Sequence, residues 1–463
     1  YGTTERTSYV DDNEAIAAVL GEIEDEDFYR VEKLKRRTKN DGSWSGYRSA
    51  SVFSSVTTAA LSDFYSSFGM QNGTNSFSFY GNTPLTSAML GVRYVLTDDQ
   101  KKDPLLTYVT KASLGRPVTP AMEEAGIVGG QNTQNASDEP TFASFNDAAA
   151  DQANANINGA ANGQANDAIN GVANGQAADQ TNGGGLPDND APNYEKPIYS
   201  TEDGLEADRG SIYLYKTKYS LPLGFMVRET TQAEVNLMTQ NPFAVQNDFV
   251  DAAAGASPIF TLGNNMSGSE ISYTAQEDGR LYFYVTQKLK SLTITTVKGR
   301  IPGSSNTFTS LECAMIVDAG EVQKGDELKL TTSDEEVDEF TVMAAMLDKD
   351  ALDDAIQALG KEPFEVEAFG DNYVKGSIDV SNAGMLFTTI PYDKGWNAYV
   401  DGKKAEVKDF YGAFIQLPLE EGQHHVEFRY RVPGKTAGLI ISIAAVLALI
   451  VLSILKRLGK SSH

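Results

Sequence analysis

Cysteine and histidine are almost absent from this chain, and their scarcity removes several kinds of site. The sequence contains one cysteine, Cys313, and therefore forms no intrachain disulfide. Its three histidines are His424, His425 and the terminal His463. On a strand the adjacent pair would point to opposite faces, so a histidine-based triad or zinc site is excluded. The GxSxG, HExxH, CxxC and P-loop motifs are also absent, and no self-contained active site is predicted.

Positive charge is scarce as well. The chain has 38 Lys and Arg against 63 Asp and Glu, a formal charge of -25 at pH 7. Because contact with phosphate backbones needs a basic surface, nucleic acid is excluded as a partner. On a body outside the cytoplasm, excess acid favours solubility. Such a body without disulfides is typical of bacterial rather than eukaryotic secreted proteins.

The first residues, YGTTERTSYVDD, are neither hydrophobic nor basic enough to form an export signal. One long hydrophobic run lies near the other end, where residues 437–455 read AGLIISIAAVLALIVLSIL. As a helix this run would rise roughly 28 Å, close to the thickness of a bilayer core. The basic stretch KRLGK follows directly. The pattern predicts a transmembrane helix over residues 436–456, a cytoplasmic tail over 457–463 and a body outside the cytoplasm.

The alternative interpretation of the hydrophobic run is a buried helix of a soluble protein. If the run does span the membrane, something else must carry the body across, and we therefore expect the chain to be the C-terminal piece of a longer protein with spans upstream.

Residues 130–193 form a biased segment rich in Ala, Asn, Gly, Gln and Asp. A twelve-residue unit recurs in it, INGAANGQANDA from Ile157 and INGVANGQAADQ from Ile169. No Lys or Arg lies between Arg116 and Lys196. With so few large apolar residues, the composition predicts a disordered insertion. Calcium loops are an alternative, but neither the GGxGxD repeat nor the EF-hand pattern is present.

On both sides of the insertion, helical and strand patterns alternate. They predict a mixed α/β domain in two parts, residues 1–129 and 194–252. Expected helices are Asp12–Glu22 and the second half of Ser49–Phe68, where Leu61, Phe64, Tyr65 and Phe68 are spaced to share one face. Expected strands are Phe28–Lys35, Met89–Thr97, Ile212–Leu214 and Phe225–Val227.

Residues 253–435 show a different pattern. Short segments in which apolar and polar residues alternate, as in strands, are separated by turn sequences. This pattern predicts an antiparallel β-sandwich region, either one sandwich or two that are split by a helix at Asp350–Leu359. Asp401–Gly402 predicts a two-residue hairpin turn, and SLECAMIV predicts a buried strand that packs the Cys313 thiol. The fold class expected is therefore α+β: a mixed α/β domain, then antiparallel sandwich domains, then one transmembrane helix.

Several segments resemble the soluble part of the bacterial membrane proteins of the YfhO family. They are YRVEKLKRRTKNDGSWSGYRSASVFSSV, GVRYVLT, LPLGFMV, NPFAVQN and TTIPYDKGWNAYVDGKKAEV, followed by EGQHHVEFRYRVPG and a last hydrophobic span. The resemblance runs in order over nearly the whole chain except the insertion. It implies a multi-spanning glycosyltransferase of the GT-C type in the bacterial cell membrane. Such an enzyme is expected to move a sugar from a polyprenyl-phosphate donor to a cell-envelope polymer on the outer face.

The resemblance also implies what this chain does not carry. The acidic catalytic residue of such enzymes is expected in an outer loop between early spans, so no catalytic residue is assigned here. Enzymes of this type commonly need a divalent metal, but the sequence shows no ligand set for one. No cofactor is expected within the chain, and the polyprenyl-phosphate donor is implied by the resemblance alone.

Candidate substrate-binding residues occur in four places. Arg30 and Glu32 are two apart on a predicted strand and share a face, which would let them line a polar cleft or a solvated strand surface. Asn40 and Asp41, before a glycine, suit hydrogen bonding to a sugar or phosphate, and also an ordinary turn. Two further groups combine amides or aromatic rings suited to sugars. For the amides the alternative is a capped helix start, and for the aromatic rings it is sandwich packing or a place at the membrane interface. These candidates are Asn241, Gln246, Asn247, Tyr392 and Trp396.

The function predicted is the extracytoplasmic C-terminal part of a YfhO-like glycosyltransferase, which positions a cell-envelope glycopolymer and the catalytic core at the membrane. One alternative is a non-enzymatic, membrane-anchored surface protein that binds carbohydrate or another partner. A second is a receptor-like or transport-accessory protein. An acidic residue in the first outer loop of the full-length protein would favour the transferase.

Overall fold

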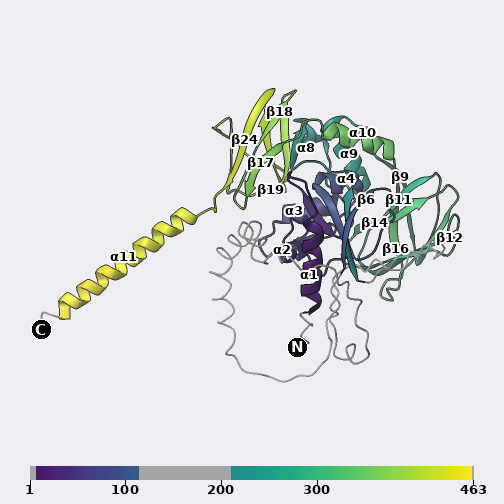
Figure 1. Ribbon diagram of the computed structural model, residues 1–463, viewed down its shortest axis with the longest axis horizontal. Helices are drawn as coiled ribbons and strands as arrows, with labels where there is room; N and C mark the ends of the chain where they lie inside the picture. The colour runs from purple at the N-terminus through teal and green to yellow at the C-terminus, as the bar shows by residue number, and fades with distance from the viewer. Residues whose placement is uncertain (1–6, 114–209, 461–463) are drawn as a thin grey trace, which may run out of the picture.

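The computed structural model describes residues 7–113 and 210–460. The predicted insertion, 130–193, lies outside the described residues. Figure 1 shows two groups of strands at opposite ends of the body, with most of the helices and a further sheet between them. The sheets are mostly antiparallel, which confirms the α+β class. The predicted domain boundaries stay predictions.

The first part of the chain builds a four-stranded sheet in the order β1-β5-β7-β6, in which β1 and β5 are parallel. Helix α1 packs on this sheet, because Ile16 and Val19 are buried against Leu96 and Leu214. The elements before the undescribed stretch are α1 (Thr7–Leu20), β1 (Arg30–Lys33), α2 (Asp41–Ser45), β2 (Val52–Phe53), α3 (Ala59–Ser67), β3 (Asn72–Gly73), β4 (Ser76–Phe77), α4 (Pro84–Met89), β5 (Val92–Thr97) and β6 (Leu106–Ser113).

Two helices of this part show how the local sequence sets the structure. In α3 the predicted apolar face is confirmed, since Leu61, Phe64, Tyr65 and Phe68 are all buried, and the left-handed Gly69 (φ 81°) follows its end. The predicted strand Met89–Thr97 is wrong at its start. Thr83 forms a capping box with Thr86 and Pro84 occupies the first turn, so a short helix, α4, runs to Met89 and β5 begins only at Val92.

Beyond the undescribed stretch the chain forms β7 (Ser211–Thr217), β8 (Gly224–Val227), α8 (Thr231–Glu234) and α9 (Pro242–Ala254). A first sandwich then pairs the sheet β10-β15-β12-β13 with the sheet β14-β11-β16-β9 around one apolar core. Its strands are β9 (Phe260–Gly268), β10 (Glu270–Thr274), β11 (Gly279–Val285), β12 (Leu289–Lys298), β13 (Ser305–Leu311), β14 (Met315–Val322), β15 (Glu327–Thr331) and β16 (Phe340–Leu347).

The second sandwich follows α10 (Lys349–Leu359), and its sheets have the orders β17-β18-β24-β20-β21 and β22-β23-β19-β8. The hairpin predicted at Asp401–Gly402 is confirmed, with positive φ at both residues (50° and 76°). The strands are β17 (Glu365–Gly370), β18 (Tyr373–Val380), β19 (Gly384–Pro391), β20 (Trp396–Val400), β21 (Lys403–Ala405), β22 (Lys408–Phe410), β23 (Phe414–Leu419) and β24 (Gly422–Tyr430).

One strand of this second sandwich, β8, comes from far earlier in the chain. It pairs with β19, as in Met226 opposite Leu386. The strands predicted at Ile212–Leu214 and Phe225–Val227 therefore both exist as β7 and β8, but they belong to different sheets.

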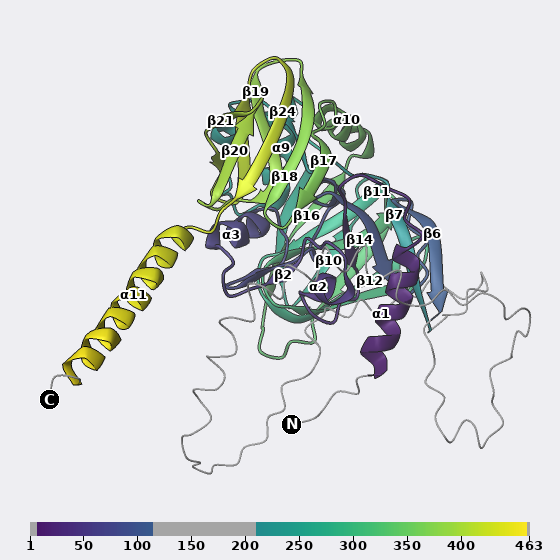
Figure 2. The same ribbon diagram turned by 60° about the vertical axis from the view of Figure 1, so that its left-hand side comes forward.

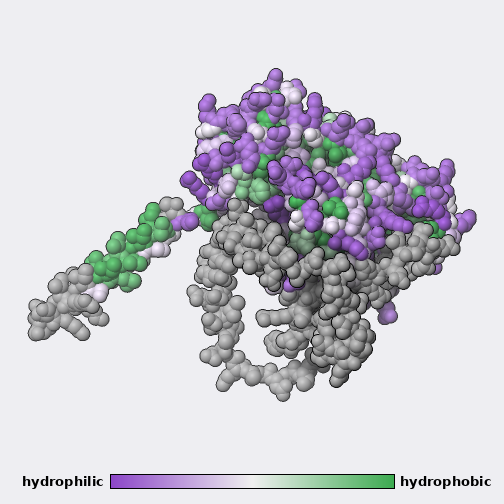
Figure 3. Space-filling view, viewed as in Figure 1, coloured by the Kyte–Doolittle hydropathy of each residue, from purple (hydrophilic) through white to green (hydrophobic). Residues whose placement is uncertain are grey.

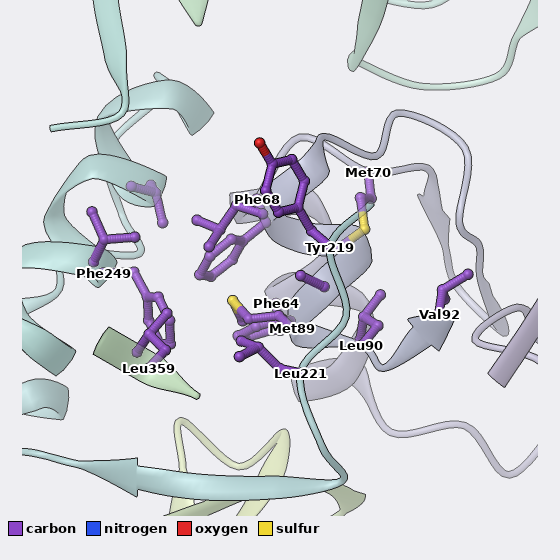
Figure 4. Close-up of a cluster of buried hydrophobic side chains, with 14 of the residues drawn as sticks. Phe64, Phe68, Met70, Met89, Leu90, Val92, Tyr219, Leu221, Phe249 and Leu359 are labelled. Atoms are coloured by element: carbon purple, nitrogen blue, oxygen red, sulfur yellow. The ribbon is translucent and has the colours of Figure 1, made fainter. Parts of the chain in front are cut away.

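A shared apolar core joins these units. Rings of α3, α9 and the second sandwich meet in it: Phe64 lies 4.9 Å from Phe414 and Phe249 lies 6.0 Å from Phe387, between ring centroids. Figure 4 shows part of this core, where side chains of α3, α4, α9 and the end of α10 gather round Leu221. Because all the units contribute to one core, the body holds its surface sites at fixed relative positions.

The last helix, α11 (Lys435–Lys460), projects away from the body (Figures 1 and 2). Hydrophobic residues cover its described middle (Figure 3); among them Leu439 is 59% and Val451 53% exposed. Within the described part of the chain, no helix meets the length and apolarity needed to cross a membrane. The span predicted over residues 436–456 is therefore not confirmed.

Candidate functional site

Arg30 links the first sheet to the second sandwich. Its Nη1 donates to the Leu90 carbonyl at 2.6 Å and to Thr389 Oγ1 at 2.9 Å, and its Nη2 donates to the Thr389 carbonyl at 3.0 Å. Burial lowers the pKa of the guanidinium. These contacts hold β1 against β19.

Glu32, two residues along β1, is only 2% exposed. Its carboxylate accepts hydrogen bonds from Ser49 Oγ at 2.6 Å, from the Ala50 amide at 2.5 Å and from Ser51 Oγ at 3.1 Å. Burial raises its pKa, and these hydrogen bonds oppose that shift. Arg30 and Glu32 thus hold separate sets of partners within the protein.

Asn40 and Asp41 organise the turn that leads into α2. The Asn40 amide donates to the Phe53 carbonyl at 3.0 Å and its Oδ1 accepts from the Phe53 amide at 2.8 Å. The Asp41 carboxylate accepts from the amides of Arg37 and Thr38 at 2.6 and 2.8 Å. Both side chains therefore fix the backbone where they lie.

The three amides near α9 attach this helix to its surroundings. Asn241 caps the helix by accepting from the Phe243 amide at 3.0 Å, which matches the capped-start alternative. Gln246 is fully buried and accepts from Thr83 Oγ1 at 2.6 Å. Asn247 accepts from the Phe260 amide and donates to its carbonyl, both at 2.9 Å.

Tyr392 and Trp396 lie at the end of the second sandwich from which α11 departs. Both are partly buried against its core. The Trp396 ring stands edge-on to Tyr430, with 5.2 Å between centroids, and Tyr430 is the last residue of β24. Of the nine predicted residues, these two combine part-exposed aromatic rings with a position beside the start of α11.

A buried polar cluster at the end of β1 was missed by sequence reasoning. Arg36, 4% exposed, stacks over the Tyr80 ring at 3.6 Å and its Nη2 donates to Gln71 Oε1 at 2.5 Å. Its Nη1 is buried and makes no hydrogen bond within the described residues. One added acceptor, a water included, would satisfy that nitrogen. The only sequence signal was the basic run KLKRRTK in an acidic chain.

The buried strand predicted around Cys313 is wrong. The segment breaks into β13 and β14, and Cys313 lies in the bend between them, partly exposed. Its sulfur accepts from the Asn72 amide at 3.5 Å, and burial raises the pKa of the thiol. The geometry favours a protonated, packed thiol over a nucleophile.

No metal site is seen among the residues that the structure describes. Among them, no group of three or more His, Cys, Asp or Glu side chains is arranged to hold an ion. Most of the candidate residues hold the backbone or other elements in place. The arrangement therefore suits a rigid body that presents aromatic rings beside α11.

Comparison with known proteins agrees with the motifs noted above. The family profile described as "Bacterial membrane protein YfhO" matches residues 1–124 and 141–442. An uncharacterized protein YfhO of Bacillus subtilis (strain 168) is 30% identical over 76 residues. That match covers 16% of this chain and 9% of the relative, so the chain spans a small part of the relative's length.

Solved structures resemble the chain only weakly. A Paenibacillus cycloisomaltooligosaccharide glucanotransferase complexed with cycloisomaltoheptaose aligns over 37% of this chain and 41% of its own, at 9% identity and a TM-score of 0.12. A cupin 2 conserved barrel domain protein from Leptotrichia buccalis aligns over 38% and 85%, at 14% identity and a TM-score of 0.13. At such scores neither likeness supports an argument about function.

Proposed function

This chain belongs to the YfhO family of bacterial membrane proteins, and we propose that it is the extracytoplasmic part of a membrane glycosyltransferase of the GT-C type. The proposed reaction moves a sugar from a polyprenyl-phosphate donor to a cell-envelope polymer. Catalysis is assigned to parts of the full-length protein outside this chain. The role left to this chain is to place the acceptor polymer near the membrane.

The family match over the whole described body is the observation that carries this proposal. We further propose that α11 enters the bilayer with its C-terminal end in the cytoplasm. Its exposed apolar side chains, Leu439 and Val451 among them, favour a non-aqueous neighbour. The uncharged run 437–455 and the basic stretch after it support the same orientation.

The connection to α11 supports a positioning role. Only residues 431–434 separate β24 from the helix, and the Arg431 amide donates to the Gly395 carbonyl at 2.9 Å. A short, hydrogen-bonded connection would keep the second sandwich close to the bilayer surface. Tyr392 and Trp396, on that end of the sandwich, are the residues proposed to contact the acceptor by stacking on its sugar rings.

Deleting the gene and measuring the sugar content of purified envelope polymers tests this function. We expect one polymer to lose a sugar substituent, and the full-length gene to restore it. A complementing gene with Trp396→Ala should restore less than the wild type, whereas Trp396→Phe, which keeps an aromatic ring, should restore more.

The alternative of a non-enzymatic binding protein predicts a different result. Membranes from the deletion strain would then still transfer sugar from an added polyprenyl-phosphate-linked donor to the isolated polymer. Unchanged polymers in the deletion strain, or unchanged transfer by its membranes, would overturn the transferase proposal.

A further inference from the structure

Three large apolar side chains are exposed in and just after α2 and β2. Trp44 is 66%, Phe53 57% and Val56 85% exposed. We call this group the α2–β2 edge. Single exposed apolar residues need no explanation, but a group of them on one part of a surface marks a site of contact.

Backbone and side-chain hydrogen bonds hold this edge in place. The Trp44 amide donates to the Asn40 carbonyl at 3.2 Å, while the Asn40 side chain bonds both backbone groups of Phe53. The next residue is also tied down, because the Ser54 amide donates to the Asn75 carbonyl at 2.9 Å. The backbones of Trp44 and Phe53, which belong to two separate segments, are thus both hydrogen-bonded to Asn40.

The charge of this region differs from that of the rest of the chain. Between Asp41, the first residue of α2, and Asp63 of α3 there is no acidic residue, and the one charged residue is Arg48, although the chain carries 63 acidic residues. An acidic protein would be repelled by an anionic membrane surface. A stretch free of acid is therefore suited to approach one.

The edge lies near the start of α11. Figure 2 shows α3 beside the base of α11 with β2 and α2 below it, and Figure 1 places α2 and α3 on that same side of the body. Phe64 of α3 packs on Phe414 of the second sandwich, so α3 lies against the unit that leads into α11. If α11 is in the bilayer, this edge is close to its surface.

We propose that the α2–β2 edge inserts Trp44, Phe53 and Val56 into the outer interface of the lipid bilayer. The inference rests on the proposed placement of α11 and adds a second point of membrane contact. A tryptophan with an apolar ring and a polar N–H suits the depth of the headgroups. Two points of contact would fix the tilt of the body above the membrane, which a single helix does not.

The two tryptophans of the chain provide the test. The full chain carrying Trp396→Phe, in which Trp44 is the sole tryptophan, is reconstituted into phosphatidylglycerol–phosphatidylcholine vesicles with or without brominated acyl chains. We expect brominated lipid to reduce Trp44 emission, because an interfacial apolar group is buried ~5–10 Å into the boundary between headgroups and acyl chains, within reach of the bromine atoms. The matched chain carrying Trp44→Phe reports Trp396, which lies beside Tyr430 at the start of the connection to α11, so its quenching measures the placement of α11 and not that of the edge.

Flotation and aqueous quenching separate the other outcomes. A chain that does not float with the vesicles overturns the span and this inference together. A chain that floats but whose Trp44 is quenched by acrylamide and not by brominated lipid overturns this inference alone. Protection of Trp44 from both quenchers would mean that protein, such as a second copy, covers the edge, and would also overturn it.

Discussion

The carboxylate of Glu32 lies below the surface and accepts one backbone and two hydroxyl hydrogen bonds. Removing such an acceptor leaves a buried donor, the Ala50 amide, without a partner. Leaving this amide unsatisfied costs more free energy than its hydrogen bond contributes, because the buried amide has been removed from water and has gained no partner. This carboxylate is therefore a structural group whose ionisation is coupled to folding.

We expect Glu32→Ala to lower the free energy of unfolding by about 1–3 kcal/mol, from the unsatisfied amide. Glu32→Gln keeps an acceptor and should cost less. The raised pKa of Glu32 in the folded state adds a pH effect. The pKa of a glutamate carboxyl in the unfolded chain is about 4.3. Between this value and the higher pKa of the folded state, Glu32 is ionised in the unfolded chain but still protonated in the folded one, so the free energy of unfolding falls as pH rises. Urea denaturation across this range should show a smaller fall for Glu32→Gln; an equal fall would contradict the assignment.

The contribution of His424 to stability also falls as pH rises, but over a higher range of pH. Its Nδ1 lies 2.9 Å from Asp401 Oδ2, and this hydrogen bond raises the pKa of the imidazole. The stabilisation is full below the unfolded pKa of about 6.5 and is lost as pH rises through the folded pKa. Asp401→Asn keeps an acceptor for the His425 amide but removes the charge. We expect it to lower the pKa of His424 in an NMR titration and to cost about 0.2–1 kcal/mol at pH 6. An unchanged titration would refute the pairing.

Among the elements, helix α9 is held by contacts at both of its ends and along its length. Asn241 caps its start, Gly255 (φ 70°) ends it, and Gln246 and Asn247 bond to other elements. Its position is therefore set by polar bonds as well as by the apolar face that carries Phe249.

Replacing the cap tests this element. Asn241→Ala should lower the free energy of unfolding by about 1 kcal/mol, because the first-turn amides lose their acceptor. Asn241→Asp, which retains an oxygen acceptor, should remain within about 0.5 kcal/mol of the wild type. Thermal or urea unfolding measures both. Equal losses in the two variants would show that the cap is not the cause.

Elements with a local signal were predictable from the sequence. Helix α3 was predicted from its apolar spacing, and the hairpin at Asp401 from its turn dipeptide. Helix α4 was missed because its six residues give too few turns for a periodic signal. The partners of Arg30 were missed for another reason: Thr389 is hundreds of positions away, and no local pattern encodes such a pairing.

At the scale of the whole molecule, ion pairs tie the first sandwich to the first sheet. Arg280 of β11 forms a bidentate pair with Asp103 at 2.8 and 2.7 Å and also bonds Asp318 at 2.6 Å. Burial alone would raise the pKa of Asp103, but the hydrogen bonds and charge of Arg280 bring it below its ordinary value. This pair therefore stabilises the fold above the unfolded pKa, and the stabilisation is lost as pH falls through the folded pKa.

We expect Arg280→Met to cost more than the ~1 kcal/mol of an exposed pair, because a buried guanidinium is lost from two partly buried carboxylates. Lys329→Met is the matched control, since its pair with Glu270 is exposed and should be worth at most about 1 kcal/mol. Denaturation followed at neutral pH measures both losses. A broadened or two-step transition in Arg280→Met alone would indicate that the sandwich has been uncoupled; similar small losses in both variants would contradict the role given to Arg280.

Strand β8 has a consequence for the order in which the protein is made. Its partner strand, β19, follows about 160 positions later in the chain. At ~5–20 residues per second, a ribosome would take on the order of 10 to 30 s to supply that partner. During this interval the apolar side chains of Leu223 and Phe225 have no sheet to join. The nascent chain is therefore prone to aggregate during this interval, and a chaperone that binds near residue 224 would cover the exposed side chains until β19 has been made.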